Sequence, residues 1–157
     1  VLLGGVNADE IPALAQLAQD GKYEVRFIEL MPIGECADWP RERFLSADAV
    51  LHALPELQRL PNEGVAERYR MPGWKGKIGL IRPMSHRFCA DCDRIRVTAD
   101  GRLKPCLHSA QEIPLRGLHG ENLERALREG MFGKPVSHHM QSVQPSESRR
   151  GMSQIGG

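Results

Sequence analysis

The stretch Phe88–Leu107 reads FCADCDRIRVTADGRLKPCL, and it gives the clearest indication of the local fold. It contains three of the chain's four cysteines, two arginines that flank Ile95, and the turn signal Ala-Asp-Gly. The segments on either side of this turn, RIRVT and RLKPC, predict a β-hairpin over residues 94–106. Because a hairpin folds the chain back on itself, it can return a cysteine at its end toward a pair of cysteines at its start.

The spacing of the cysteines is typical of metal ligands. Cys89 and Cys92 form a C-x2-C pair, and Cys106 follows 14 positions after Cys92. One loop can present both sulfurs of such a pair to a single centre, which suits either zinc or an iron–sulfur cluster. Zinc usually takes a fourth protein ligand, which His108 or His86 could supply. Buried structural cysteines are a third interpretation, so the residues alone leave all three open.

Two arginines follow the C-x2-C pair. Arg94 and Arg96 lie two positions apart on the predicted strand, so we expect both side chains on one face of it. Guanidinium groups beside a metal centre suit a phosphate-bearing ligand, because each can donate paired hydrogen bonds to it. A solvated, charged strand face explains the same spacing equally well.

The composition excludes several classes of function. The 157 residues are 41% hydrophobic and 26% charged, which is ordinary for a soluble globular protein large enough to bury a core. The net charge of +1 gives no argument for a nucleic-acid partner, and no apolar run is long enough to span a membrane. We expect the cysteines to be free thiols or metal ligands, as in an unsecreted protein.

The N-terminal part predicts a β-α-β pattern. The first residues read as a strand, residues 7–20 as a helix that Asn7 or Asp9 can cap, and residues 22–31 as a buried strand. Strand, helix and strand in this order are typical of a parallel sheet.

The rest of the chain predicts shorter elements. They are a helix capped by Ser46, strands at residues 65–71 and 77–82, a helix at residues 121–131, and an irregular segment at residues 134–157. Within that segment, His138 and His139 are expected to face solvent or pack against the tail. Trp39 and Trp74 are expected to be packing anchors.

Taken together, these residues resemble the GTP 3′,8-cyclase family of radical S-adenosylmethionine enzymes, also called molybdenum cofactor biosynthesis protein A. FCADCDRIRVTADGRLKPCL is similar to the cluster motif in the C-terminal half of the family. Three other segments are similar to family segments in the same order: GGVNADEI (4–11), VRFIELMPIGE (25–35) and the final IGG. The resemblance covers nearly the whole chain.

The resemblance implies an α/β fold with two parts. Residues 1–35 would be the last strand, helix and strand of a partial, TIM-like (α/β)6 radical barrel. Residues 36–157 would be an α+β iron–sulfur domain that binds GTP. The family's radical-generating C-x3-C-x2-C motif is absent, since no cysteine precedes Cys36. We therefore expect the C-terminal half of a longer lyase, inactive by itself. A poorly folding remnant of that lyase is the remaining alternative.

The resemblance also implies a reaction. In the family, an N-terminal 4Fe-4S cluster cleaves S-adenosylmethionine reductively, and the resulting radical converts GTP to 3′,8-cyclo-7,8-dihydro-GTP in molybdenum cofactor (molybdopterin) biosynthesis. The implied setting is a cytoplasmic enzyme that is a homodimer when full length. Its product passes to cyclic pyranopterin monophosphate synthase.

Specific residues match the family motifs by position. Cys89, Cys92 and Cys106 match the ligands of a second 4Fe-4S cluster, whose open iron meets the guanine of GTP. Arg94 and Arg96 match paired arginines that contact GTP. A zinc-binding structural module built on the same cysteines is the alternative.

The strand VRFIELM carries a further match. Arg26 and Met31 match residues that contact S-adenosylmethionine. Their odd separation places them on opposite faces of a straight strand, so both reach one ligand only if the strand ends or bends near Met31. From the residues alone, a salt bridge of Arg26 with Glu24 or Glu29 explains the arginine equally well.

The last match concerns the C-terminus, and it comes with departures from the family pattern. Gly156 and Gly157 match a tail that enters the active site, although a frayed terminus is the usual interpretation of such an end. Asp93 stands where the family usually has asparagine, and Gly4 stands where a lysine is common. Cys36 has no family role and is expected to be a bystander.

Overall fold

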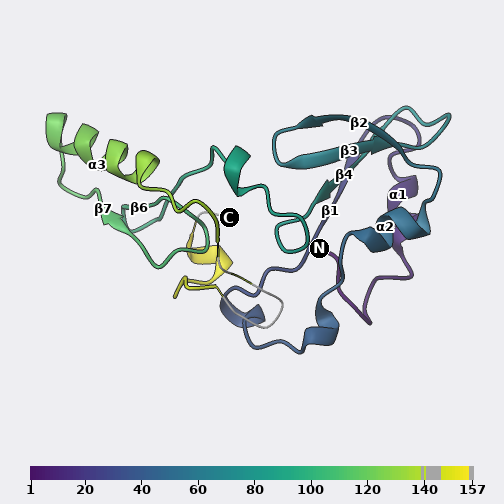
Figure 1. Cartoon of the computed structure of the whole chain (residues 1–157), viewed down its shortest axis with the longest axis horizontal. Coiled ribbons are helices and arrows are strands. Elements are labelled where there is room, and N and C mark those ends of the chain that lie inside the picture. Colours follow the sequence, from purple (N-terminus) through teal and green to yellow (C-terminus); the bar gives the residue numbers. More distant parts are fainter. Residues whose placement is uncertain (139, 141–145, 156–157) are drawn as a thin grey trace. The chain divides into compact units, whose positions relative to one another are not determined.

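The computed structural model describes residues 1–138, 140 and 146–155 (Figure 1). The chain divides into two compact units. The N-terminal unit comprises Val1–Leu30 and Pro40–Asp91, and the C-terminal unit comprises Met31–Trp39 and Cys92–Gly157. The functional division expected between residues 35 and 36 remains a prediction.

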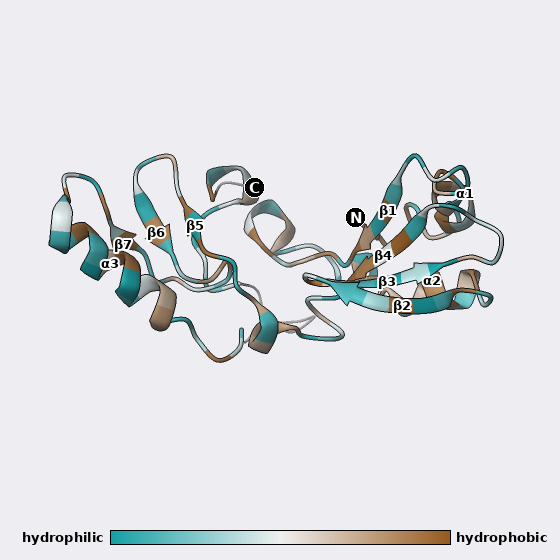
Figure 2. Cartoon of the chain, turned by 90° about the horizontal axis from the view of Figure 1, so that it is seen from above, coloured by the Kyte–Doolittle hydropathy of each residue, from teal (hydrophilic) through white to brown (hydrophobic). Residues whose placement is uncertain are grey.

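The N-terminal unit contains a four-stranded mixed sheet in the order β1-β4-β3-β2. Its strands are β1 (Glu24–Ile28), β2 (Gln58–Glu63), β3 (Ala66–Arg70) and β4 (Lys77–Ile81). β1 pairs with β4 in parallel, whereas β3 pairs antiparallel with both β4 and β2. The inner strand β4 is rich in apolar residues and the edge strand β2 is mostly polar, as Figure 2 shows. This distribution fits strands that are respectively covered and exposed.

Two short helices accompany this sheet, α1 (Ile11–Gln16) and α2 (Asp48–Ala53). Alternate residues of β4 share a face, so Ile78 and Leu80 both point into the core and are fully buried. Trp74 packs against this core as predicted, but Trp39 is 44% exposed and is not a packing anchor. The buried core consists of Leu2, Ile11, Ala15, Ala18, Phe27, Ala47, Val50, Leu54, Tyr69, Ile78 and Leu80.

The predicted strands at residues 22–31, 65–71 and 77–82 are confirmed in type. The first residues were also predicted to form a strand, but they contribute only an isolated parallel bridge between Leu2 and Glu29, and the predicted cap of the first helix is wrong. The Asn7 side chain accepts a hydrogen bond from the Leu3 backbone at 2.9 Å, and α1 begins after Glu10 without a side-chain cap. The Asn7 side chain therefore stabilises the preceding turn instead of capping α1. At the start of α2, the predicted cap Ser46 accepts a hydrogen bond from the Asp48 amide at 3.2 Å, but Ala47 is the residue that directly precedes the helix.

The C-terminal unit contains a three-stranded antiparallel sheet with one helix. The sheet has the order β5-β6-β7, with β5 (Arg96–Val97), β6 (Arg102–Lys104) and β7 (Ile113–Pro114). α3 (Gly120–Phe132) contacts both β6 and β7. The predicted hairpin and the predicted last helix are confirmed, whereas β7 was not predicted because two residues give no periodic signal.

Four single-turn 3-10 helices complete the described elements: η1 (Gly34–Cys36), η2 (Arg41–Arg43), η3 (Cys89–Asp91) and η4 (Met152–Gln154). The chain is therefore a mixed α/β protein, as predicted. The described strands form two open sheets, and the assignment of the first to a radical barrel remains a prediction. Across residues 1–138, 140 and 146–155, no helix is both long enough and apolar enough to cross a membrane.

Candidate functional site

The β5–β6 hairpin determines where the candidate residues of the C-terminal unit lie. Arg96 pairs with Lys104 and Val97 with Leu103, so the hairpin closes through residues 98–101. The buried Thr98 hydroxyl accepts from the Arg102 amide at 3.0 Å, which reinforces the turn. Gly101 has a φ of 79°, a conformation that glycine adopts without steric cost. The Ala-Asp-Gly signal in the sequence is thus explained by the turn geometry.

The three cysteines of the motif are all reduced and half-buried. Cys89 is the first residue of η3 in the N-terminal unit, whereas Cys92 and Cys106 belong to the C-terminal unit. Within the described residues, no three His, Cys, Asp or Glu side chains are gathered in an arrangement that could hold a metal ion. The three free thiols are suitable metal ligands, but the described residues do not bring them together as a ligand set.

Lys134 lies against the backbone that follows Cys92. Its Nζ donates to the Cys92 carbonyl at 2.5 Å and to the Arg94 carbonyl at 2.9 Å, and it lies 3.7 Å from the Cys92 Sγ. The lysine comes two residues after the end of α3. No motif in the sequence indicates this contact, because the partners of Lys134 lie about 40 positions earlier in the chain.

A second lysine, Lys104, comes two positions before Cys106 and is almost completely buried, with 1% of its surface exposed. Its Nζ donates to the Ser109 carbonyl at 2.6 Å and lies 3.8 Å from a Glu112 carboxylate oxygen. Burial lowers the pKa of Lys104, and the charge of Glu112 opposes that effect. The surroundings of Cys106 therefore include a buried amine held by specific partners.

The two arginines do not share a strand. β5 begins at Arg96, so Arg94 lies in the preceding irregular segment and is exposed, whereas Arg96 is half-buried. The prediction that both side chains point to one face of a strand is therefore wrong, because the hairpin is shorter than the sequence pattern. Their proximity in sequence to Cys92 is unchanged.

His108 is a buried residue two positions after Cys106, with 8% of its surface exposed. Burial, followed by the nearby His138, Arg96 and Lys104, lowers the pKa of His108 to about 3, so its imidazole is neutral at physiological pH. The His108 and His138 rings meet edge to face with their centroids 5.0 Å apart. His138 is thus buried rather than facing solvent, and His139 lies outside the described residues.

The segment of residues 146–155 is bound within the C-terminal unit. Ser146 donates from its amide to the Pro32 carbonyl at 2.9 Å and from its hydroxyl to the His108 carbonyl at 3.2 Å. Gly34 and Gly151 approach so closely that a Cβ on Gly34 would lie 2.8 Å from the Gly151 Cα. Further along, Ile155 is fully buried. Gly156 and Gly157 lie outside the described residues.

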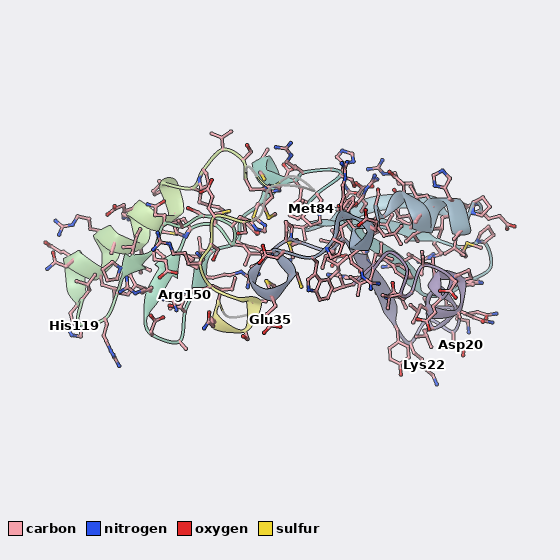
Figure 3. The ribbon with its side chains drawn as sticks, turned by 90° about the horizontal axis from the view of Figure 1, so that it is seen from below. Asp20, Lys22, Glu35, Met84, His119 and Arg150 are labelled. Atoms are coloured by element: carbon pink, nitrogen blue, oxygen red, sulfur yellow. The ribbon has the colours of Figure 1, made fainter. Side chains whose placement is uncertain are left out.

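Arg150, labelled in Figure 3, forms ion pairs with two carboxylates of the C-terminal unit. Its guanidinium donates two hydrogen bonds to Glu112, at 2.6 and 2.9 Å, and one to Asp100 at 2.7 Å. The Arg150 guanidinium lowers the pKa of both carboxyl groups, and for Asp100 the pKa falls well below its usual range. This clamp joins the tail to the hairpin turn, and no sequence motif indicated it.

In the N-terminal unit, the candidate residues form ordinary structural contacts. Arg26 is exposed on β1 and forms a 2.7 Å ion pair with Glu24, which agrees with the salt-bridge interpretation. The strand ends at Ile28, and the half-buried Met31 already belongs to the C-terminal unit. His86 is 65% exposed and lies 3.3 Å from Glu67.

Comparisons with known proteins show what this sequence is similar to. A family model described as Molybdenum Cofactor Synthesis C matches residues 23–140. The GTP 3′,8-cyclase of Alkaliphilus oremlandii (strain OhILAs) is 44% identical over an alignment 162 positions long, and that of Alkaliphilus metalliredigens (strain QYMF) is 46% identical over the same length. Each alignment covers 100% of this chain and 51% of the relative. The chain therefore spans about half the length of these curated relatives.

Proposed function

The chain belongs to the Molybdenum Cofactor Synthesis C family, and from that premise we propose that it is the substrate-binding half of a GTP 3′,8-cyclase. The observation that carries the proposal is the similarity of the whole chain to enzymes of that name, at 44% and 46% identity. That similarity includes the segment with Cys89, Cys92 and Cys106. The proposed division is a barrel part at residues 1–35 and a cluster domain at residues 36–157.

The donor chemistry of the chain fits a 4Fe-4S cluster. Cys89, Cys92 and Cys106 are reduced, and thiolates are the ligands that iron in such clusters takes. The Lys134 Nζ lies 3.7 Å from the Cys92 Sγ, so a hydrogen-bond donor stands beside one of the three sulfurs. Since the described residues hold no completed ligand set, we propose that metal binding completes it, as is common when binding and folding are coupled.

The roles of the residues follow from this ligand set. Cys89, Cys92 and Cys106 would hold the cluster, which when bound supplies an iron with one position open to the guanine of GTP. Arg94 and Arg96 would bind the triphosphate, because guanidinium groups hold phosphate oxygens by paired, charge-assisted hydrogen bonds. The protein thus orients GTP, and the ribose is left free to react.

The radical chemistry belongs to the proposed whole enzyme. An N-terminal cluster and S-adenosylmethionine, contacted here by Arg26 and Met31, would generate the radical that converts GTP to 3′,8-cyclo-7,8-dihydro-GTP. Gly156 and Gly157 would approach the substrate, since glycine backbone can come close to a ligand. We further propose a cytoplasmic homodimer at full length, whose product is consumed by cyclic pyranopterin monophosphate synthase.

Anaerobic reconstitution of the chain tests this proposal. Iron and acid-labile sulfide are quantified, and the electron paramagnetic resonance spectrum of the reduced sample is recorded with and without GTP. We expect about four irons per chain, with a spectrum that changes when GTP is added. Bound zinc without sulfide would overturn the proposal.

That outcome would support the second candidate, a structural zinc site. The observation that favours it is His108, a buried and neutral imidazole two positions after Cys106. A neutral imidazole with three cysteines is a common set of zinc ligands. The H108A variant distinguishes the two, because it should weaken zinc binding but leave the iron and sulfide content of a three-cysteine cluster unchanged.

The substrate arginines have their own test. The R94A and R96A variants should each weaken GTP binding several-fold in calorimetry while the iron content stays the same. R128A is the matched control, because Arg128 is an exposed arginine of α3 that pairs with Glu124. Unchanged GTP binding in both R94A and R96A would contradict the triphosphate assignment.

A further inference from the structure

We propose that Lys134 is a positioning residue for the cluster at Cys92 and for Arg94, which lies two positions after Cys92. Its ammonium group donates to the Cys92 sulfur and holds the backbone from Cys92 to Arg94. The inference rests on the proposed function of the three cysteines and adds to it a residue that tunes the cluster.

The ammonium group of Lys134 has as many acceptors around it as it has N–H donors. An ammonium group has three N–H donors, and Lys134 has three acceptors: the Cys92 carbonyl at 2.5 Å, the Arg94 carbonyl at 2.9 Å and the Cys92 Sγ at 3.7 Å. The side chain is half-buried. All the hydrogen-bonding capacity of the lysine is thus directed at one short segment.

Among the described residues, the acceptors of Lys134 are neutral groups. Two are carbonyls and one is a thiol sulfur, and among the described residues no carboxylate forms an ion pair with Lys134. Lys104 differs in this respect, because its ammonium group forms an ion pair with the Glu112 carboxylate at 3.8 Å. Lys134 therefore places an ammonium group beside the Cys92 sulfur.

The position of Lys134 is also fixed by its place next to the end of α3. Lys134 follows the C-terminus of α3, where the Gly133 amide donates to the Glu129 carbonyl at 2.8 Å. α3 in turn packs against β6, with Gly130 directly over the buried Leu103. The segment from Cys92 to Ile95 lies outside every helix and strand, so a contact with a fixed side chain is a means of positioning it.

Two consequences follow from the contact. A hydrogen bond and a positive charge at a ligand sulfur stabilise the more negative, reduced form of a cluster, which raises its reduction potential. In addition, the bond to the Arg94 carbonyl fixes the backbone from which the Arg94 side chain extends. We therefore expect Lys134 to affect both the potential of the cluster and the affinity for GTP.

The experiment compares K134M, K134R and the wild-type chain, each reconstituted anaerobically. K134M keeps the length of the side chain but removes its charge and donors, whereas K134R keeps both. K22M is the matched control, because Lys22 is exposed in the N-terminal unit. The midpoint potential of the cluster is measured by a redox titration followed by electron paramagnetic resonance. GTP affinity is measured by calorimetry.

We expect the potential of K134M to shift to a lower value and its GTP affinity to fall several-fold, with K134R close to wild type and K22M unchanged. A wild-type chain that takes up no iron and sulfide would overturn the proposed function itself. A wild-type chain that holds the cluster, together with a K134M variant of unchanged potential and GTP affinity, would overturn only the role of Lys134.

A measurement on the metal-free chain separates positioning from cluster assembly. Hydrogen exchange of the Asp93 and Arg94 amides should become faster in K134M and stay near wild type in K134R, and equal exchange in K134M and wild type would contradict the positioning role. If K134M takes up no iron, restored iron content and potential in K134R support the proposal. Failure of K134R to restore them overturns it.

Discussion

Glu29 lies just after β1 and is fully buried, and its two carboxyl oxygens receive hydrogen bonds from four donors. The Ala47 amide donates to Oε1 at 3.0 Å, and the amides of Met84 and Ser85 donate to Oε2 at 3.0 and 2.8 Å. The Ser85 hydroxyl is the fourth donor, and Met84 is labelled in Figure 3. One side chain therefore joins the end of β1 to the start of α2 and to the turn after β4.

Removing this side chain should destabilise the chain strongly. In E29A, three backbone amides lose their acceptor, one of them fully buried and two partly buried, and we expect a loss of about 3 kcal/mol in the free energy of unfolding. Urea unfolding measures it. E56A is the control, since Glu56 is exposed and its removal should change stability by less than about 0.5 kcal/mol. An equally small effect in E29A would show that the four hydrogen bonds contribute little.

The Arg150 clamp gives the tail a pH dependence whose direction follows from the pKa values. The Arg150 guanidinium lowers the pKa of Glu112 and Asp100 below their ordinary values of 4.5 and 3.8. Groups with a lowered pKa in the folded state stabilise it fully above the ordinary values, and this stabilisation is lost as the pH falls through the folded-state pKa. Docking of the tail should therefore be constant near neutral pH and weaken below about pH 4.5.

Hydrogen exchange of the amides of residues 146–155, corrected for the intrinsic effect of pH, measures this docking. The wild-type chain should lose protection only on acidification. R150A should show low protection already at neutral pH and a flatter pH profile. R149A is the adjacent control and should follow the wild type. Equal protection in R150A and wild type at neutral pH would mean that the other tail contacts suffice.

The key contacts at this scale could not be predicted from the sequence. Glu29 bonds Ser85 across 56 positions, Lys134 bonds Cys92 across 42, and Arg150 bonds Asp100 across 50. Such pairs depend on tertiary packing, which leaves no local pattern. The hairpin turn and the C-x2-C spacing were predictable because their determinants lie within a few residues of one another.

At the scale of elements, Gly130 explains how closely α3 packs on the sheet. A Cβ at this position would lie 2.1 Å from the Leu103 Cδ2 and 3.0 Å from its Cγ. Leu103 is fully buried on β6, so it has little room to move away. A glycine in a helix interior destabilises the helix by about 1 kcal/mol relative to alanine. Here the missing side chain allows the close contact with Leu103.

G130A should therefore destabilise the chain, although alanine favours helix. We expect a net loss of about 2 kcal/mol in urea unfolding, because overpacking a buried contact exceeds the gain in helix propensity. The exposed residue Glu121 of the same helix is the control, and E121A should be nearly neutral. A G130A variant more stable than wild type would show that Leu103 repacks without strain.

The strands that could not be predicted from the sequence depend on pairing with a neighbouring strand. β2 carries the polar sequence QRLPNE with a proline, and it forms a strand because β3 pairs with it at the edge of the sheet. β7 is a two-residue strand that exists only through its pairing with β6. Arg94 was placed in a strand because the alternating sequence continues beyond the pairing that ends at Arg96.

At the scale of the whole molecule, the cysteines are distributed over both compact units. Cys89 belongs to the N-terminal unit and Cys92 and Cys106 to the C-terminal unit, while Cys36 lies at the end of η1. All four are half-buried free thiols. Cluster binding by three of them would therefore change their reactivity and leave the fourth as an internal reference.

Alkylation followed by peptide mass spectrometry should reveal this difference. In the metal-free chain, iodoacetamide should label all four cysteines, because none forms a disulfide. After anaerobic reconstitution, labelling of Cys89, Cys92 and Cys106 should fall at least tenfold while Cys36 stays reactive, since coordinated thiolates are poor nucleophiles. Protection of Cys92 and Cys106 with Cys89 still labelled would show that another residue completes the ligand set. Loss of labelling at Cys36 would mean that it is a ligand and that the assignment of three cysteines is wrong.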